Sequence, residues 1–189
     1  MQNTFSVNEI DNIKSIKQQM WTGVQSAMDK TLPSHMMTFL RDNAILTGGA
    51  TASIFHGDLP SDWDLYLKEQ QYIDAFNEWL KNKGNEDYVE NVDEKYVTQN
   101  VPGGKLITAR AVTFKNKIQV ITMQTSEKRT QFDMLHCMPW YDLNSDTLHI
   151  SRAQYDSIRD KKIVKNTHVD ASPITTWRMD KYQNRGWKV

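Results

Sequence analysis

The sequence predicts an α+β fold, in which a small mixed β-sheet is backed by helices and helical extensions precede and follow it. Three observations predict this class: an amphipathic helical pattern comes first, a strand-helix-strand-helix order follows, and hairpin-linked strands precede the last helices. Of the 189 residues, 39% are hydrophobic and 24% are charged, as in ordinary globular proteins. No apolar stretch approaches the roughly 18 residues of a membrane span, so we expect no membrane partner.

The first 42 residues are expected to be helical. Over residues 6–30, apolar side chains recur every three or four residues, which predicts one face of a helix. Leu32-Pro33 interrupts this pattern, and a shorter helix is expected over residues 34–42.

The catalytic core is expected over residues 44–150. A short apolar run at 44–47 ends at two glycines, and a helix is expected over 50–55. Alternating residues predict a strand over 63–67, and a helical face predicts a helix over 70–83.

Hairpin-linked strands are expected next, over residues 94–99 and 106–114, with a third strand over 118–123. Helices are expected over 133–142 and 151–161.

A final helix is expected to start at Ser172-Pro173, because proline is favoured in the first helical turn, and to end near Asn184. Residues 151–189 would then be a C-terminal helical extension, and residues 1–189 would form a single domain.

Charge is balanced over the whole chain but not along it. There are 23 basic and 23 acidic residues, which argues against a general nucleic-acid coat. Residues 58–94 carry 11 acidic and 3 basic residues, whereas residues 161–189 carry 7 basic and 2 acidic residues. The two segments are either two walls of one cleft or two solvated faces.

Cysteine content indicates the compartment. Cys137 is the single cysteine, which excludes an internal disulfide framework and a cysteine-rich zinc site. Residues 1–13 are polar and do not form a secretory signal pattern. We therefore expect a cytoplasmic protein, in which Cys137 is a core thiol.

Two glycines and two aspartates form the pattern that carries chemistry. Gly48 and Gly49 separate an expected strand from a helix, so the backbone can approach a ligand and the helix N–H groups can face a phosphate. Asp62 and Asp64 lie two residues apart on an expected strand, which puts both on one face. Paired carboxylates favour a hard cation such as Mg²⁺ or Mn²⁺. Either pair alone is typical of a turn or a solvated face, but together they predict a site for a metal-bound nucleotide.

This combination resembles the nucleotidyltransferase signature of the DNA polymerase beta superfamily, in particular the head domain of class II CCA-adding enzymes and bacterial poly(A) polymerases. In those enzymes Gly-Gly is followed eight residues later by a helix-ending glycine, and then by a Pro-x-Asp-x-Asp strand. This chain has Gly49, then Gly57, then Pro-Ser-Asp-Trp-Asp at 60–64. The resemblance covers about residues 44–189.

Two later motifs of that family are matched in the same order. One is an Arg-Arg-Asp motif that ends in Tyr-Asp, and the other is the basic Arg-x-x-Arg-Phe-x-x-Arg pattern of a neck helix followed by Gly-Phe. The matching residues are Asp133, Tyr141, Asp142, Arg178, Lys181, Tyr182, Arg185, Gly186 and Trp187.

The resemblance implies transfer of a nucleoside monophosphate from an NTP to a hydroxyl of RNA, of a protein or of a small molecule, with release of pyrophosphate. Asp62 and Asp64 would be the catalytic residues and would hold Mg²⁺ or Mn²⁺. The implied nucleotide-binding residues are Gly48, Gly49, Ala50, Thr51, Asp133, Arg178, Lys181 and Arg185. Compact forms of this kind are similar to orphan nucleotidyltransferases of bacteriophages, which would place the protein in the host cytoplasm.

The sequence departs from the family at several positions. A later strand of the family carries a third carboxylate where this chain has Gln119, and the helix after Gly-Gly carries Arg-Asp where this chain has Ala52-Ser53. The sequence has no match to the family's base-reading Glu-Asp-x-x-Arg motif, so we expect weak selection among NTPs.

Two alternatives to a general nucleotidyltransferase therefore stay open. Gln119 favours a catalytically degenerate protein with a structural or interaction role, for example in a phage particle. A toxin that transfers NMP to a host tRNA or protein is the other alternative. The oligomeric state is not indicated.

Three aromatic residues lie near the matched basic positions. Trp177, Tyr182 and Trp187 are expected to pack in the protein rather than to stack on bases.

Overall fold

The structure is a computed structural model that describes residues 5–92 and 111–189. Its strands are β1 (Ala44–Thr47), β2 (Trp63–Leu67), β3 (Val89–Val92), β4 (Ala111–Phe114), β5 (Ile118–Ile121), β6 (Trp140–Asp142) and β7 (Thr147–His149). Its α-helices are α1 (Ile13–Asp29), α2 (Ser34–Asn43), α3 (Ala50–Phe55), α4 (Gln70–Leu80), α5 (Arg152–Arg159) and α6 (Thr176–Gln183). None of the helices in these two ranges is long and apolar enough to cross a membrane.

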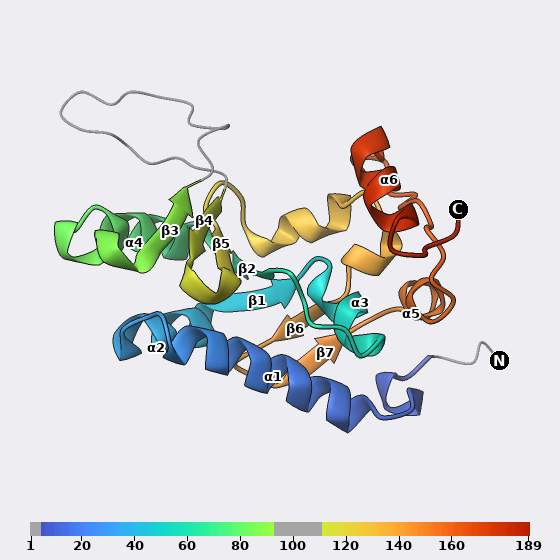
Figure 1. The fold of residues 1–189 in the computed structure, drawn as a ribbon, viewed down its shortest axis with the longest axis horizontal. Coiled ribbons are helices and arrows are strands. Elements are labelled where there is room, and N and C mark those ends of the chain that lie inside the picture. The colour runs from blue at the N-terminus through green and yellow to red at the C-terminus, as the bar shows by residue number, and fades with distance from the viewer. Residues whose placement is uncertain (1–4, 93–110) are drawn as a thin grey trace.

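The described strands form one seven-stranded mixed sheet in the order β3-β4-β5-β2-β1-β6-β7 (Figure 1). Among the strands of residues 5–92 and 111–189, only β2 and β5 are parallel neighbours, and the other neighbouring pairs are antiparallel. The expected α+β class with a mixed sheet is therefore confirmed.

Helices cover one face of this sheet. Figure 1 shows α1 and α2 running along the same side of the strands. The buried face of α1 shares one hydrophobic core with Leu65 of β2, Val120 of β5 and Phe76 of α4. A side chain at Gly23 of α1 could not fit there, because its Cβ would lie 2.3 Å from the Trp63 ring. The opposite face of the central strands is consequently left for the site.

Most helix predictions are confirmed with small shifts at the ends. Helices α2, α3, α4 and α5 occupy the expected segments, and α3 has the expected bounds. The first helix begins at Ile13 rather than Ser6, because Asn12 adopts a left-handed conformation with φ of 61° after a short 3₁₀ turn, Val7–Glu9. Helix α5 begins after a capping box in which the Ser151 hydroxyl accepts from the Gln154 N–H.

The helix predicted over residues 133–142 is wrong. This segment instead contains a 3₁₀ turn (Leu135–Cys137) followed by strand β6. Pro139 explains the difference, since it has no N–H to donate and a helix that continued through it would lose a hydrogen bond there. Tyr141 then pairs with Leu46 of β1 and with Leu148 of β7, a strand that the sequence did not predict.

The start predicted for the last helix is also wrong. Helix α6 begins at Thr176, where the Thr175 hydroxyl accepts from the Arg178 N–H at 3.3 Å. The Ser172 N–H donates instead to the Gln131 carbonyl at 2.9 Å, which ties this residue to another loop.

The predicted hairpin lies mostly outside the described residues, which exclude 93–110. Strand β4 covers the end of its second arm, and β5 covers most of the third expected strand. Strand β3, at the edge of the sheet, was not predicted.

Candidate functional site

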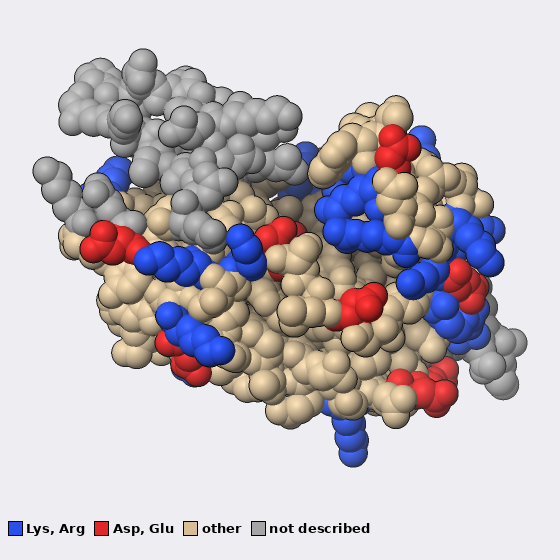
Figure 2. All heavy atoms as spheres, in the orientation of Figure 1, with Lys and Arg blue, Asp and Glu red and all other residues tan. Residues whose placement is uncertain are grey.

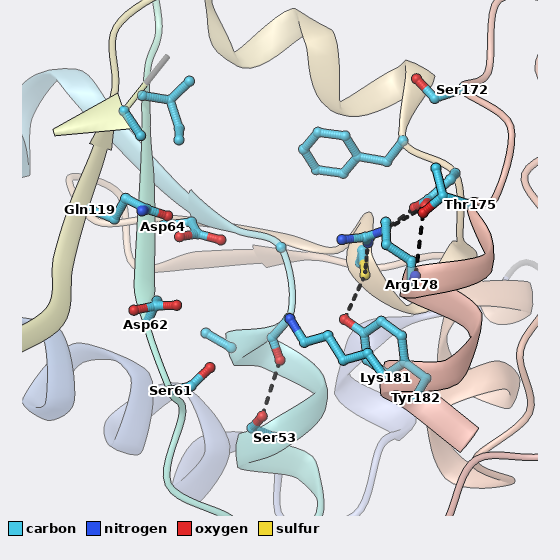
Figure 3. A pocket seen from close by; sticks show the side chains of 18 of the residues that line it. Ser53, Ser61, Asp62, Asp64, Gln119, Ser172, Thr175, Arg178, Lys181 and Tyr182 are labelled. Atoms are coloured by element: carbon cyan, nitrogen blue, oxygen red, sulfur yellow. Dashed lines mark hydrogen bonds and ion pairs between the residues drawn. The ribbon is translucent and has the colours of Figure 1, made fainter. Parts of the chain in front are cut away.

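The two motif aspartates lie on the face of the sheet opposite to α1 and α2. Trp63, Leu65 and Leu67 of β2 point into the core, so strand alternation places Asp62 and Asp64 on the opposite face. Both carboxylates point into one cleft of about 470 Å³ (Figure 3). The geometric expectation for this pair is therefore met.

The glycine loop after β1 comes close to the second aspartate. Thr47 pairs with Asp64 across the β1–β2 ladder. Gly48 follows with φ of +83°, and a Cβ on it would lie 2.9 Å from the Asp64 Oδ2. The Gly48 N–H donates to the Cys137 carbonyl at 3.1 Å, which holds the loop in place. A residue with a side chain would thus be both strained and too close to the carboxylate.

Helix α3 begins at the floor of the cleft. Gly49 is its N-cap and provides no side-chain cap, while Ala50 lines the cleft. Thr51, predicted to bind nucleotide, is fully buried and does not line the cleft. Ser53 does line it, and its hydroxyl donates to the Gly49 carbonyl at 3.2 Å. Thr51 is therefore not placed to contact a ligand in the cleft, whereas Ala50 and Ser53 of the same helix are.

Gln119 takes the place next to the aspartates. It pairs with Asp64 in the parallel β2–β5 ladder and lines the same cleft. Its amide nitrogen donates to the Thr113 hydroxyl at 3.0 Å, so it is held on its own hairpin. An amide oxygen can bind a metal ion but cannot accept a proton as a carboxylate does.

The donor set fits a metal ion shared with a substrate. Mg²⁺ is usually held by one or two carboxylates together with phosphate oxygens, which Asp62 and Asp64 satisfy. Within residues 5–92 and 111–189, no group of three or more His, Cys, Asp or Glu side chains is placed to hold a metal ion alone. Such an ion would therefore depend on phosphate from a bound ligand.

The wall opposite the aspartates is helix α6, which carries the predicted basic residues. Arg178 and Asp133 form a bidentate ion pair, with Nε–Oδ2 at 2.5 Å and Nη2–Oδ1 at 3.1 Å. Burial opposes the charge on Arg178, but Cys137 and the bond to Asp133 outweigh it and raise the arginine pKa. The structure thus brings these two predicted residues together, and each neutralises the charge of the other.

Lys181 and Arg185 continue this wall. Both line the cleft, and Lys181 extends from α6 toward the start of α3 (Figure 3). Burial and the neighbouring Arg185 and Arg178 lower the Lys181 pKa, whereas Asp64 acts to raise it. Basic side chains gather around the part of the surface where α6 lies, beside the cleft (Figure 2). Two acidic residues of segment 58–94 and three basic residues of segment 161–189 therefore line the same cleft.

A small aromatic cluster holds α6 against the rest of the protein. The His136 ring is fully buried, 4.3 Å from the Tyr182 ring centroid and 4.1 Å from that of Trp187. Burial and then Arg178 lower the pKa of His136 to about 3. Cys137 is also buried, 3.3 Å from the Tyr182 hydroxyl, and burial raises its thiol pKa. The expectations of a core thiol and of packed Tyr182 and Trp187 are confirmed.

The expectation for Trp177 is wrong, because this side chain is 68% exposed and lines the cleft. Four hydroxyl residues of the lining were not predicted from the sequence. They are Ser53, Ser61, Ser172 and Thr175. Ser61 and Ser53 could have been found, since one precedes Asp62 and the other lies one helical turn after Gly49.

The chain belongs to the family described as "Gabija anti-defense 2 family protein", which matches residues 14–161. No curated protein is similar to it at a significant level.

Several solved structures of CCA-adding enzymes are similar to parts of the chain. A CCA-adding enzyme with CTP is 17% identical, with a TM-score of 0.44, over 78% of this chain and 36% of that chain. The Thermotoga maritima CCA-adding enzyme complexed with tRNA is 12% identical, with a TM-score of 0.42, over 86% and 46%. The Bacillus stearothermophilus CCA-adding enzyme with CTP is 13% identical, with a TM-score of 0.41, over 90% and 37%. The chain thus spans less than half of each of these, and the similarity concerns the fold, not the activity.

Proposed function

We propose that this protein is a nucleotidyltransferase that transfers NMP from an NTP to a hydroxyl group and thereby counteracts a defence system. The observation that carries the proposal is the cleft itself. Asp62 and Asp64 lie on one wall beside the Gly48-Gly49 loop, and Lys181 and Arg185 lie on the other. Binding of a metal-bound triphosphate needs negatively charged side chains to hold the cation and positively charged side chains to hold the phosphates.

Each part of the cleft would then have a role. Because Gly48 and Gly49 carry no side chains, the phosphates could approach the backbone closely there. Lys181 and Arg185 would neutralise the remaining charge of the phosphates. Asp62 and Asp64 would hold Mg²⁺ or Mn²⁺, which stabilises charge on the phosphoryl oxygens. The acceptor oxygen would form a bond to the α-phosphorus, and the bond from that phosphorus to the oxygen shared with the β-phosphorus would break. Pyrophosphate would leave with that oxygen, and the hydroxyl proton would pass to solvent water.

The family description supports the biological part of the proposal. It describes an anti-defense protein and names Gabija as the defence. A component of that defence, either a protein or an RNA, is therefore the acceptor that we propose. Transfer of NMP to such a component would inactivate it by adding a bulky, charged group.

The direct test is a search for a labelled product. The protein is incubated with each α-labelled NTP, Mg²⁺ or Mn²⁺ and extract of cells that carry the defence system. We expect a labelled protein or RNA with wild type and none with Asp62→Asn. Asp74→Asn is the matched control, because Asp74 is exposed on α4 outside the cleft. Equal labelling by wild type and Asp62→Asn would contradict the proposal.

A catalytically inactive binding protein is the second candidate. Gln119 favours it, since this amide stands beside Asp64 where the resembled enzymes carry a carboxylate. This candidate predicts that Asp62→Asn and Asp64→Asn still protect against the defence in cells. The enzyme predicts that both variants lose protection while they remain folded.

A further inference from the structure

The most exposed tryptophan of the protein lies at the cleft. Trp177 is 68% exposed, whereas the other five tryptophans are buried or half-buried. Large aromatic side chains are costly to leave in water and are enriched where proteins bind ligands. Trp177 is in the first turn of α6 and lines the same cleft as Asp62 and Asp64.

The backbone that carries this ring is held by its neighbours in the chain. Thr175 caps the helix, and Arg178, the next residue along the chain, is pinned to Asp133 by two hydrogen bonds. The Lys181 Nζ lies 5.5 Å from the Trp177 ring centroid, one helical turn further on. A flat aromatic surface and a cation are thus held side by side at the cleft.

This pairing suits a nucleotide better than another ligand. A nucleobase has a π-face that stacks on an aromatic side chain whatever the base, and its phosphate lies within reach of a neighbouring cation. Phe132 is another aromatic residue of the cleft lining, but its ring packs against Tyr66 with centroids 5.6 Å apart. Trp177 is the aromatic residue of the lining with most of its surface available.

We propose that Trp177 is a stacking platform for a nucleobase, either of the incoming NTP or of a nucleotide in the acceptor. This inference rests on the proposed function and assigns the part of the same cleft that holds the base. Stacking reads no base edge, so the platform binds all four bases with similar strength. It would also explain how the cleft can bind a nucleotide without a base-reading motif.

The test compares ligands with and without a base. Affinities for ATP, for inorganic tripolyphosphate and for a short RNA tetranucleotide are measured by tryptophan fluorescence and calorimetry, with Mg²⁺ present. Trp177→Ala should weaken ATP binding about tenfold and leave tripolyphosphate binding unchanged. Trp177→Phe should keep most of the ATP affinity but lose most of the fluorescence quenching.

Two controls make the result specific. Lys181→Ala should weaken binding of ATP and tripolyphosphate together, because it removes a charge and not a surface for stacking. Val169→Ala should change neither, since Val169 is 91% exposed and lies outside the cleft lining.

The ligands also separate the source of the base. A loss confined to ATP assigns the platform to the incoming nucleotide, and a loss confined to the tetranucleotide assigns it to the acceptor. The proposal is overturned if Trp177→Ala changes neither affinity, if it weakens tripolyphosphate as much as ATP, or if wild type binds none of these ligands. Loss of base binding in Phe132→Ala but not in Trp177→Ala would also overturn it.

Failure of the proposed function would look different. Trp177-dependent binding of ATP without any labelled product would refute transfer and leave the platform in place. Transfer by Trp177→Ala with the KM values of wild type, for both NTP and acceptor, would refute the platform and leave the enzyme in place.

Discussion

The two walls of the cleft are built in different ways. The acidic wall is formed by Asp64 of β2 and by Asp62, just before this strand. Strand β2 is central, between β1 and β5, and its other face is buried in the main core. The basic wall is an eight-residue helix with one buried residue, Tyr182, and an ion pair to Asp133. The acidic groups are therefore fixed by the sheet, whereas the basic groups depend on a few long-range contacts. Changes in the first wall should affect chemistry, and changes in the second should affect stability and binding.

The largest expected effect is on the acidic wall. Asp64→Asn should lower the transfer rate by at least about a thousandfold, or about 4 kcal/mol in the barrier, because a neutral amide holds the cation poorly. The melting temperature should stay equal or rise, since one of two neighbouring carboxylates is removed. Transfer at the wild-type rate by this variant, with Asp74→Asn as the control, would end the catalytic assignment.

The pH dependence of stability should identify the cluster that holds the basic wall. His136 has a folded pKa of about 3, below its ordinary 6.5, so the unfolded chain takes up the proton first as the pH falls. Stability should therefore fall below pH 6.5, by about 3 kcal/mol by pH 4. Urea unfolding at pH 7 and pH 4 measures this loss.

His136→Phe should remove most of that pH dependence, because phenylalanine fills the site without titrating. His168→Gln, a change at an exposed histidine, should keep it. If both variants lose stability with acid as wild type does, another group is responsible.

The ion pair between Arg178 and Asp133, both predicted to bind nucleotide, should contribute less to stability than His136 does. Arg178→Met leaves the buried Asp133 carboxylate uncompensated and should lower the free energy of unfolding by about 2 kcal/mol. Asp133→Asn in the same chain should restore part of that loss, which a double-mutant cycle measures. Additive losses would show that the two groups do not interact in solution.

The smallest expected effect is on phosphate binding. Lys181→Ala should weaken ATP binding about tenfold at low salt, and Arg185→Ala somewhat less, because Arg185 is more exposed. Both losses should shrink in high salt. Lys165→Ala, at an exposed lysine outside the cleft lining, should have no effect at either salt concentration. If all three variants bound ATP with the affinity of wild type, the binding-protein candidate would be favoured.

The sequence determined the elements whose cause is local. The three- and four-residue apolar spacing predicted α1 and α4, and the alternation around Asp62 and Asp64 predicted both the strand and its two faces. Gly48 was also found from the sequence, because a strand that ends in glycines before a helix indicates a close approach of the backbone. Each of these signals lies within a few residues of the feature that it predicts.

The tertiary structure decided what depends on distant partners. Strand β6 forms because β1 offers it an edge, and β7 then pairs with β6, which three-residue segments cannot reveal. The sequence gives Arg178 a charge, but only the fold shows that Asp133, 45 residues earlier, takes it up. In the same way, Trp177 reads as apolar, and the direction of α6 leaves it in water at the cleft. Burial and pairing are properties of the whole packed chain, so local patterns could set the residue types of this site but not their partners.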